Sequence, residues 1–587
     1  MSQKKLRENR KKIQDTRNKI QDTGNRIQET NEFLPKFLDI LKKYKVFLLI
    51  ACGMAVLLYA NAMGGAFVSD DYATLPQNQQ LGNFAFNIKK DGMLLPNTMV
   101  MTNFFINKLF GVTSPVPYHI VSLLWYLATI VLSFVFLILV FKNDLLAKVA
   151  TIIFIFMPIH VEAVSWNAGK IYLILATYIL ASVINFIYFI DREKLLNLYM
   201  ALGFFWLAFA TDRPRPFAIF LILILYIMCQ ENWREITKRY LKYWMVVLAI
   251  LIVSVLASLP AVNIRVDDVN SGTNASESYF YSPFFQYPLS IPKYLQLNVF
   301  PVDLTLYHTM FVLPGWLNWL ILLSYLGLLI YFFIYDKRYF FALAFIFMAV
   351  APSMAPVKVS WLVAERYMFL GSLGMATFIA LLLVNDKKRI SILSLSLLVG
   401  LCGIYGYLVL KRNVDWRTNH NLWVKTCQVS PNSHNAWNNI GDDYDKLGQY
   451  ENAVKGFTQS TLVKPNYADA FHNRANILFK MGRLDLAKDS YETAVTISPN
   501  LYQSYLSISQ IAIQQKDYVT ASENLEKALK FVPGDPQVLY FYAVVQANLN
   551  KIDEAKRILN SIVLAYPEFV QARQVLTALN KGQTLVP

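Results

Sequence analysis

Five prolines recur at a fixed step in the last quarter of this 587-residue chain, and that step constrains the fold more than any other feature. Each lies 34 residues after the one before: Pro431, Pro465, Pro499, Pro533 and Pro567. Alanines keep the same interval, at Ala453, Ala487, Ala521 and Ala555. A period of this length indicates stacked helix–turn–helix units, none of which can bury its apolar face alone. We therefore expect an elongated helical arm over residues 413–587.

The 34-residue period is typical of tetratricopeptide repeats. The first unit has small and large packing residues at Gly441, Tyr444, Ala453 and Phe457. We expect a half repeat, a short terminal cap and, between them, four full repeats at 434–467, 468–501, 502–535 and 536–569. Because the groove of such an array binds extended peptides or partner proteins, we expect this arm to hold an acceptor or partner protein.

The chain before Asn413 consists of long apolar runs separated by short charged loops. With 55% hydrophobic and only 16% charged residues, the whole is too apolar for a soluble protein. A helix that crosses a bilayer needs about 20 mostly apolar residues. Eleven candidate spans occur, near 46–63, 118–141, 146–165, 171–190, 195–211, 217–230, 243–263, 315–335, 339–357, 366–384 and 390–410. We predict an all-α protein, with a multi-span membrane domain over 46–412 that carries the arm.

Basic residues are concentrated in a heptad-like leader, 1–45, and in the short loops on one side of the spans. The positive-inside rule places these segments in the cytoplasm. An odd number of spans then puts loops 64–117 and 264–314, and the arm, on the outer side. The net charge of +16 is thus a topology signal and not a sign of nucleic-acid binding. We expect a bacterial inner membrane, or the endoplasmic reticulum membrane if the source is a eukaryote.

Ionisable residues gather at the outer ends of the spans, where charge is costly and indicates function. They are Asp70, Asp71, His160, Glu162, Lys170, Asp212, Arg213, Arg215, Lys358, Glu365 and Arg366. A carboxylate can take the proton of an acceptor hydroxyl, and cations can stabilise a leaving phosphate. Any one of these residues could be a turn, a cap or a lipid contact, but together they favour group transfer from a phosphate-bearing lipid. No His/Cys cluster has metal-ligand spacing, and metal dependence stays open.

Six strings, in order, resemble the transmembrane and tetratricopeptide-repeat-containing (TMTC-type) protein O-mannosyltransferases of the GT-C glycosyltransferase class. They are FVSDDY (67–72), PYHIVSLLWY (117–126), MPIHVEAVSWNAGKIYL (157–173), FPVDLTLYH (300–308), VAERYMFLGSLG (363–374) and NVDWRTNHNLWVKTCQVSPNS (413–433). The resemblance implies a catalytic first outer loop, a polyprenyl-phosphate sugar donor and inversion at the anomeric carbon. The donor would be an undecaprenyl- or dolichyl-phosphate sugar, mannose or similar, and the acceptor a Ser or Thr hydroxyl.

The resemblance also implies roles for single residues. Asp70 and Asp71 match the paired acidic motif, and one of them, with Asp71 favoured, would deprotonate the acceptor. We assign donor binding to six residues, His160, Glu162, Lys170, Arg213, Glu365 and Arg366. Among these, Arg366 is the expected phosphate clamp, because a guanidinium can grip two phosphate oxygens. At Asp212-Arg213 the relatives have Lys-Glu, which leaves the role of that position open.

Two alternatives remain. A lipid-linked oligosaccharide ligase or polymerase would favour a large central outer loop rich in Arg and His, whereas loop 264–314 has only Arg265, Lys293 and His308. A non-catalytic membrane scaffold that recruits partners through its repeats would not need Asp70, Asp71 or Arg366.

Overall fold

A computed structural model describes most of the chain. The described residues are 35–78, 81–82, 97–243, 245–246, 249–250, 252–257, 259, 283–311, 313–354 and 361–581. Within this part every regular element is a helix, apart from one isolated bridge between Val384 and Ile390. The predicted all-α fold is confirmed, and the heptads of the leader, at 1–34, lie outside the described residues.

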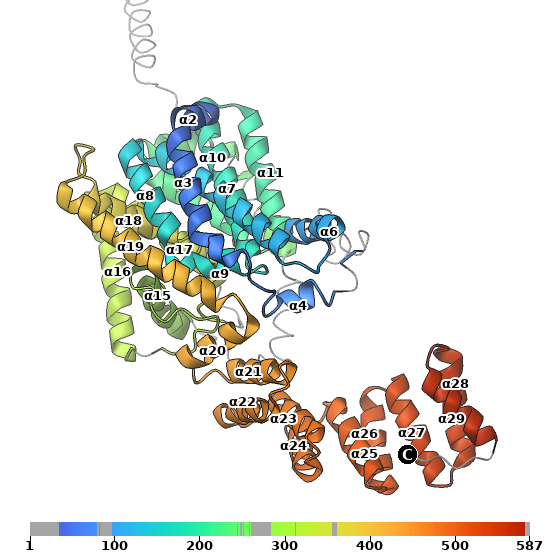
Figure 1. The fold of residues 1–587 in the computed structure, drawn as a ribbon. Coiled ribbons are helices and arrows are strands. Elements are labelled where there is room, and N and C mark those ends of the chain that lie inside the picture. Colours follow the sequence, from blue (N-terminus) through green and yellow to red (C-terminus); the bar gives the residue numbers. More distant parts are fainter. Residues whose placement is uncertain are drawn as a thin grey trace, which may run out of the picture.

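The first half of the membrane body is a bundle of helices that run up and down beside one another (Figure 1). Its helices are α2 (Phe37–Lys43), α3 (Lys45–Tyr59), α7 (Val116–Phe141), α8 (Asp144–Phe156), α9 (Val161–Ser165), α10 (Lys170–Arg192), α11 (Leu195–Thr211), α12 (Ala218–Met228) and α13 (Trp233–Arg239). Pro158 interrupts the chain between α8 and α9, because proline cannot continue a helical hydrogen-bond ladder, and the two parts meet at a bend of 57°.

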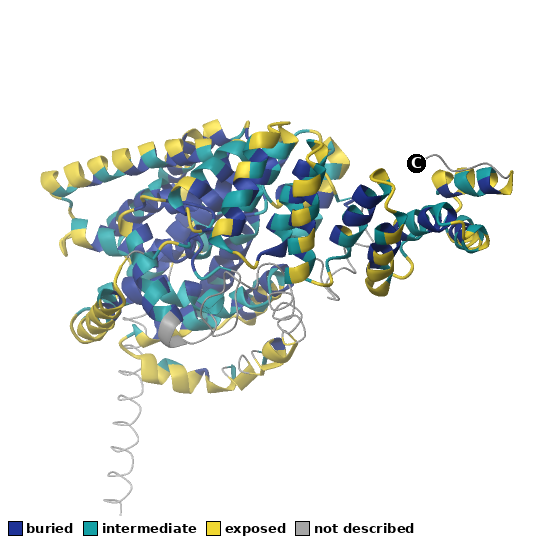
Figure 2. Cartoon of the chain, turned by 90° about the horizontal axis from the view of Figure 1, so that it is seen from below, coloured by how far each residue is buried: buried dark blue, intermediate teal, exposed yellow. Residues whose placement is uncertain are grey.

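The second half of the body packs against this bundle through α8, α12 and α3. It consists of α15 (Pro283–Val299), α16 (Gly315–Tyr335), α17 (Lys337–Val350), α18 (Ser372–Leu383) and α19 (Ile392–Asp415). On α16, large apolar side chains such as Trp316, Leu323 and Ile330 lie on the outside. Figure 2 shows the same division over the whole body, with buried residues between the helices and exposed ones on their outer faces. Exposed apolar surface of this kind suits contact with lipid.

Six of the described helices are long and apolar enough to cross a membrane, or seven if α8 and α9 form one bent span. This is the pattern of a multi-pass membrane protein. The sequence predicted eleven spans, but three of these correspond to shorter apolar helices, at Leu195–Thr211, Arg215–Met228 and Ser372–Leu383. Another, 243–263, includes residues that are not described.

The two long loops predicted to lie on the outer side, 64–117 and 264–314, contain helices that the apolar pattern did not predict, and we keep the names first and second outer loop for them. The first holds the one-turn helix α4 (Asp71–Thr74) and α6 (Thr98–Phe110), whose N-terminus is capped by the side chain of Asn97. The second holds α15, with Pro288 and Pro292 inside it. These helices are too short or too polar to be read as spans, and they position the outer end of the body.

The arm leaves the body through α20 (Asn419–Val429) and continues as four helix pairs and a final helix (Figure 1). The pairs are α21 (His434–Lys446) with α22 (Tyr450–Val463), α23 (Ala468–Lys480) with α24 (Leu484–Ile497), α25 (Tyr502–Gln514) with α26 (Tyr518–Phe531), and α27 (Pro536–Asn548) with α28 (Ile552–Ala565), followed by α29 (Val570–Asn580). The first helices of the pairs begin 34 residues apart, which is the step of the prolines.

Candidate active site

The predicted site residues lie at the end of the body from which the arm emerges. In Figure 1, α4, α9 and α20 are all at this end. The backbone ties these segments together, because Ala66 donates a hydrogen bond to the carbonyl of Arg417 and the backbone N–H of Ser69 donates one to the side chain of Asn419. The loop that carries Asp70 and Asp71 is therefore attached to the first residues of the arm.

Asp71 and Asp70 occupy different environments at the start of α4. Asp70 is exposed, whereas Asp71 is fully buried. One Asp71 carboxylate oxygen accepts a hydrogen bond from the N–H of Ala168, at 2.8 Å, and the other accepts one from Val68, at 3.3 Å. Burial raises the pKa of Asp71 to about 7, although these two bonds and the Lys170 ammonium oppose the shift. A carboxylate with this pKa is well matched to general-base chemistry near neutral pH.

Lys170 lies close enough to Asp71 to act on its charge. Its Nζ donates to Oδ1 of Asn103 at 2.7 Å and lies 5.5 Å from the centre of the Tyr118 ring. Asn103 comes from α6, so the first outer loop provides hydrogen-bond partners for both Asp71 and Lys170. A fully buried ammonium needs such partners because desolvation of a charge is costly.

Glu162 and Arg366 form a buried ion pair across the body. The guanidinium of Arg366 bonds one carboxylate oxygen of Glu162, and its backbone N–H donates to the other at 2.9 Å. The guanidinium also lies 5.4 Å from the ring of Trp166. Trp166 in turn donates from Nε1 to the carbonyl of Val68 and stacks on Trp416 at 5.6 Å. The ion pair and the Asp71 loop are thus linked through one indole.

Glu365 is the centre of a second buried cluster. Its Oε1 accepts hydrogen bonds from the N–H of Thr305, at 2.6 Å, and from Arg412, at 3.1 Å. Nε2 of His308 lies 3.4 Å from the same oxygen. Burial raises the pKa of Glu365 to about 7, against the opposing effect of Arg412. This cluster joins the second outer loop to the end of α19.

His160 makes its hydrogen bonds outside these clusters. His160 is buried among aromatic rings, with Nδ1 at 3.1 Å from the Tyr126 hydroxyl and Nε2 at 2.7 Å from the Ser372 hydroxyl. Arg213 is partly exposed. Its neighbour Arg215 pairs with Asp212 and lies 5.1 Å from the ring of Tyr367, the ring that Arg366 also approaches at 5.1 Å. Arg215 therefore lies close to the predicted clamp, Arg366.

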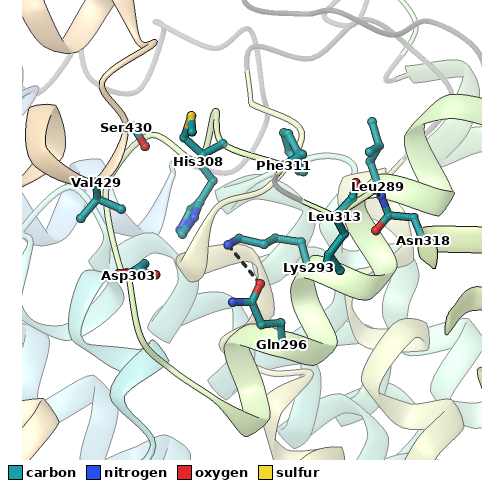
Figure 3. Close-up of a pocket in the computed structure, with 11 residues that line it drawn as sticks. Leu289, Lys293, Gln296, Asp303, His308, Phe311, Leu313, Asn318, Val429 and Ser430 are labelled. Atoms are coloured by element: carbon teal, nitrogen blue, oxygen red, sulfur yellow. Dashed lines mark hydrogen bonds between the residues drawn. The ribbon is translucent and has the colours of Figure 1, made fainter. Parts of the chain in front are cut away.

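A cavity of about 400 Å³ opens beside the Glu365 cluster (Figure 3). Its polar lining includes Lys293, Gln296, Asp303 and His308, and Lys293 donates to Gln296 at 3.1 Å. Apolar residues of α15 and the second outer loop, among them Leu289, Phe311 and Leu313, and the polar Asn318 of α16 complete the wall. Val429 and Ser430, at the end of α20, close the side that faces the arm. Burial lowers the pKa of His308 to about 3, so its imidazole is neutral at pH 7.

Several residues of the site were not selected from the sequence. Arg412, Asn103, His308 and Trp166 contact the predicted residues. His308 and Trp166 lie inside the matching strings 300–308 and 157–173, whereas Arg412 and Asn103 lie outside all six strings. For Arg412 a signal existed, since a charged residue near the outer end of a span is costly. Among the described residues, no group of three or more His, Cys, Asp and Glu side chains could hold a metal ion.

The chain resembles known proteins both in its repeats and over most of its length. Family models described as tetratricopeptide repeat match residues 434–467, 468–501 and 512–579. Over 474 residues the chain is 23% identical to "Protein O-mannosyl-transferase TMTC3" of Homo sapiens, which covers 70% of this chain and 50% of that protein. The Mus musculus protein of the same name is 23% identical over 461 residues, covering 69% and 50%. The chain is a distant homologue of these proteins and spans about half their length.

Solved structures match over smaller parts. MamA is 15% identical, with a TM-score of 0.24, over 30% of this chain and 92% of its own. YrrB, described as a TPR protein with an unusual peptide-binding site, is 14% identical, with a TM-score of 0.26, over 27% and 82%.

Proposed function

We propose that this protein is a membrane glycosyltransferase that moves a sugar from a polyprenyl-phosphate carrier to a hydroxyl on an acceptor protein. The observation that carries the proposal is Asp71, a buried carboxylate with a pKa raised to about 7, held in the outer loop next to the root of the arm. The distant homology to protein O-mannosyltransferases supports the same class of reaction.

In the proposed step, Asp71 takes the proton of a Ser or Thr hydroxyl as the hydroxyl oxygen attacks the anomeric carbon. The bond between that carbon and the phosphate oxygen breaks, and its electron pair leaves with the carrier phosphate. Attack from the face opposite the phosphate inverts the anomeric configuration. The two backbone N–H groups that bind Asp71 fix the direction of its carboxylate, and a fixed base needs little reorganisation during the reaction.

The donor head group, in this proposal, occupies the cavity beside Glu365. Lys293 supplies a cation on its wall, and the neutral His308 imidazole supplies a hydrogen-bonding group. The apolar residues of its lining, and the exposed apolar side of α16, suit the first isoprene units of a carrier. Arg366 and Lys170 would then stabilise the negative charge that develops on the leaving phosphate.

Orientation follows from the charge of the loops. With basic loops in the cytoplasm, we place the leader inside and the site and arm on the periplasmic or luminal side. Hydroxyl acceptors on exported proteins would meet the site there. A divalent metal is not required by this scheme, and the sugar is mannose or a similar hexose.

The test is sugar transfer by the purified protein in lipid vesicles. Labelled undecaprenyl- and dolichyl-phosphate sugars serve as donors, and Ser/Thr-containing peptides as acceptors. We expect Asp71→Asn to lower turnover by about 10²- to 10⁴-fold, the usual contribution of a general base. Asp70→Asn is the matched control, because it removes an adjacent but exposed carboxylate, and we expect a smaller loss.

Lys293→Ala tests the donor cavity and should raise the KM for the donor more than it lowers kcat. If wild type turns over and both Asp variants match it, the base is assigned wrongly. If wild type transfers no sugar from either donor to any acceptor, while it stays folded, the scaffold function replaces this proposal.

A further inference from the structure

Polar residues recur at two positions of the first three repeats. At one position are Asn439, Asn473 and Ser507, and at the other, three residues later, are Asp442, Asn476 and Gln510. Residues three apart lie on the same face of a helix, and here the helices are α21, α23 and α25. We call these six residues the polar ladder. Five of the six line one cavity of about 420 Å³ along these helices.

The ladder keeps unused hydrogen-bonding capacity. Asn473 donates to the side chain of Asn438, and Asn476 accepts from the Tyr491 hydroxyl. An Asn or Gln amide has two N–H donors and an oxygen that can accept twice. These bonds therefore leave an acceptor on Asn473 and donors on Asn476. All six ladder residues are half-buried, so a ligand can reach them while much bulk water is displaced.

Such amide and hydroxyl groups are suited to hydrogen-bond the backbone of an extended polypeptide rather than any particular side chain of that polypeptide. An extended chain presents an N–H and a C=O at every residue, and an amide side chain can satisfy both. A folded domain uses these groups internally and would present few of them. The lining also includes Phe457, Ile477 and Phe479, which give apolar contact that does not depend on sequence.

The first two ladder residues along the arm, Asn439 and Asp442, adjoin the candidate active site. Asp442 accepts from Lys446 at 2.6 Å, and the Lys446 ammonium lies 5.8 Å from the ring of Tyr72, the residue after Asp71. On the other side, Asn439 lies 3.4 Å from the hydroxyl of Tyr307, in the second outer loop that also forms the donor cavity. The end of the ladder therefore lies between the loop of the proposed base and the loop of the proposed donor cavity.

We infer that the polar ladder binds the backbone of an extended, unfolded acceptor polypeptide and leads it to Asp71. The arm would then supply affinity without selecting a sequence, and the hydroxyl that reaches the base would be the one that is modified. This inference rests on the proposed function for its catalytic consequence, but the binding itself can be measured without a sugar donor.

The experiment uses the full-length protein in lipid nanodiscs and a fluorescein-labelled, unstructured peptide rich in Ser, Thr, Gly and Ala. The test variant is Asn473→Ala with Asn476→Ala. Its matched control is Asn452→Ala with Asn500→Ala, which removes two amides from the same arm outside the cavity lining. We expect the ladder variant to weaken binding by about tenfold, because two hydrogen bonds are lost, and the control to bind like wild type.

Two further probes separate backbone from side-chain recognition. A peptide of scrambled sequence should bind as tightly as the original, and a peptide with N-methylated backbone should bind more weakly. In the transfer assay, the ladder variant should raise the KM for the long peptide while turnover of a very short hydroxyl acceptor stays unchanged.

The inference is overturned if wild type does not bind the peptide, or if the ladder variant binds it like the control. It is also overturned if the peptide of scrambled sequence binds with a different affinity from the original. Its failure can be told apart from failure of the proposed function. If wild type transfers sugar but the ladder variant binds the peptide like the control, the proposed enzyme survives and the ladder inference fails. If the peptide binds through the ladder but no sugar is transferred, the ladder inference survives and the proposed function fails.

Discussion

The membrane body and the repeat arm organise their interiors in opposite ways. The body has one continuous core that runs from α2 to α19 and includes Trp416, Leu422 and Ile440 from the junction and the first repeat. Beyond that point the arm has separate small cores, one around Tyr491, one around Leu525 and one around Leu559. The first helix of the first repeat, α21, therefore packs with the body, whereas α22 contributes Ala453 and Phe457 to a separate core and each later repeat depends mainly on its neighbours.

The two regions also treat charge differently. In the body, carboxylates such as Glu162 and Glu365 are fully buried and paired with arginines. In the arm, ion pairs such as Lys480–Asp445 are exposed and lie at the edge of an open groove. Fixed, buried charge suits a reacting centre, and an accessible polar surface suits binding of a chain. In the proposed function, the packing of α21 against the body holds the groove of the arm next to the candidate active site.

The largest difference is expected when single ion-pair partners are removed. Glu162→Gln leaves Arg366 buried with less charge compensation, which should destabilise the body by about 3–5 kcal/mol. The matched arm variant, Asp445→Asn, breaks an exposed pair with Lys480 and should cost about 0–1 kcal/mol. Thermal unfolding in detergent, followed by intrinsic fluorescence, measures both. Equal shifts in the two variants would mean that the pair in the body is not desolvated as described.

A second contrast concerns where unfolding occurs. Leu422 and Leu525 are both fully buried, the first in the body core and the second in a core of the arm. Substitution of either by Ala should cost about 2–5 kcal/mol, from lost burial and the cavity that remains. The Leu422→Ala loss should lower the stability of the whole body, whereas the Leu525→Ala loss should stay within neighbouring repeats. Hydrogen exchange of α8 and α10 distinguishes them. Protection there should fall only in Leu422→Ala.

This contrast also explains what the sequence could predict. The arm is built from contacts between neighbours 34 residues apart, so prolines and alanines at that step predicted its helix pairs. The site joins segments far apart in the chain, such as Glu162 with Arg366, 204 residues away, and Asn103 with Lys170, 67 residues away. Motifs indicated which segments matter, but the string 300–308 did not show that His308 would face Glu365, and Arg412 lies just outside the last string. Apolar run length predicted eleven spans, whereas six or seven of the described helices are long and apolar enough to cross a membrane. Three other described helices are apolar but shorter.

The pH dependence should separate chemistry in the body from binding in the arm. Because burial raises the pKa of Asp71 to about 7, the carboxylate is protonated below that pH and cannot accept a proton. Transfer should therefore rise with pH through about 7, and at two pH units below it should be about 100-fold slower. Peptide binding should change less, because the amides of Asn473, Asn476 and Gln510 do not titrate.

Activity profiles of wild type and Asp70→Asn, with parallel binding measurements, check this expectation. The rise should persist in Asp70→Asn. A transfer rate that does not vary between pH 5 and pH 8 would exclude Asp71 as the base.

The smallest expected difference is between two glycines at close packing contacts. A Cβ on Gly374, in the body, would lie 2.6 Å from the carbonyl oxygen of Ala342 and 2.9 Å from the N of Ile346, so two backbones would have to separate. A Cβ on Gly441, in the arm, would lie 2.9 Å from the ring of Phe457, a side chain that can rotate away. Overpacking costs about 1–3 kcal/mol, and we expect Gly374→Ala near the upper end and Gly441→Ala near the lower.

Thermal unfolding of the two alanine variants measures this difference, with Gly403→Ala as the control, because a Cβ there meets nothing within 4 Å. The control should match wild type. If Gly441→Ala costs as much as Gly374→Ala, the first repeat is packed as rigidly as the body, and its fusion to the body core extends through α22 as well as α21. That result would move the boundary between the two regions outward by one helix.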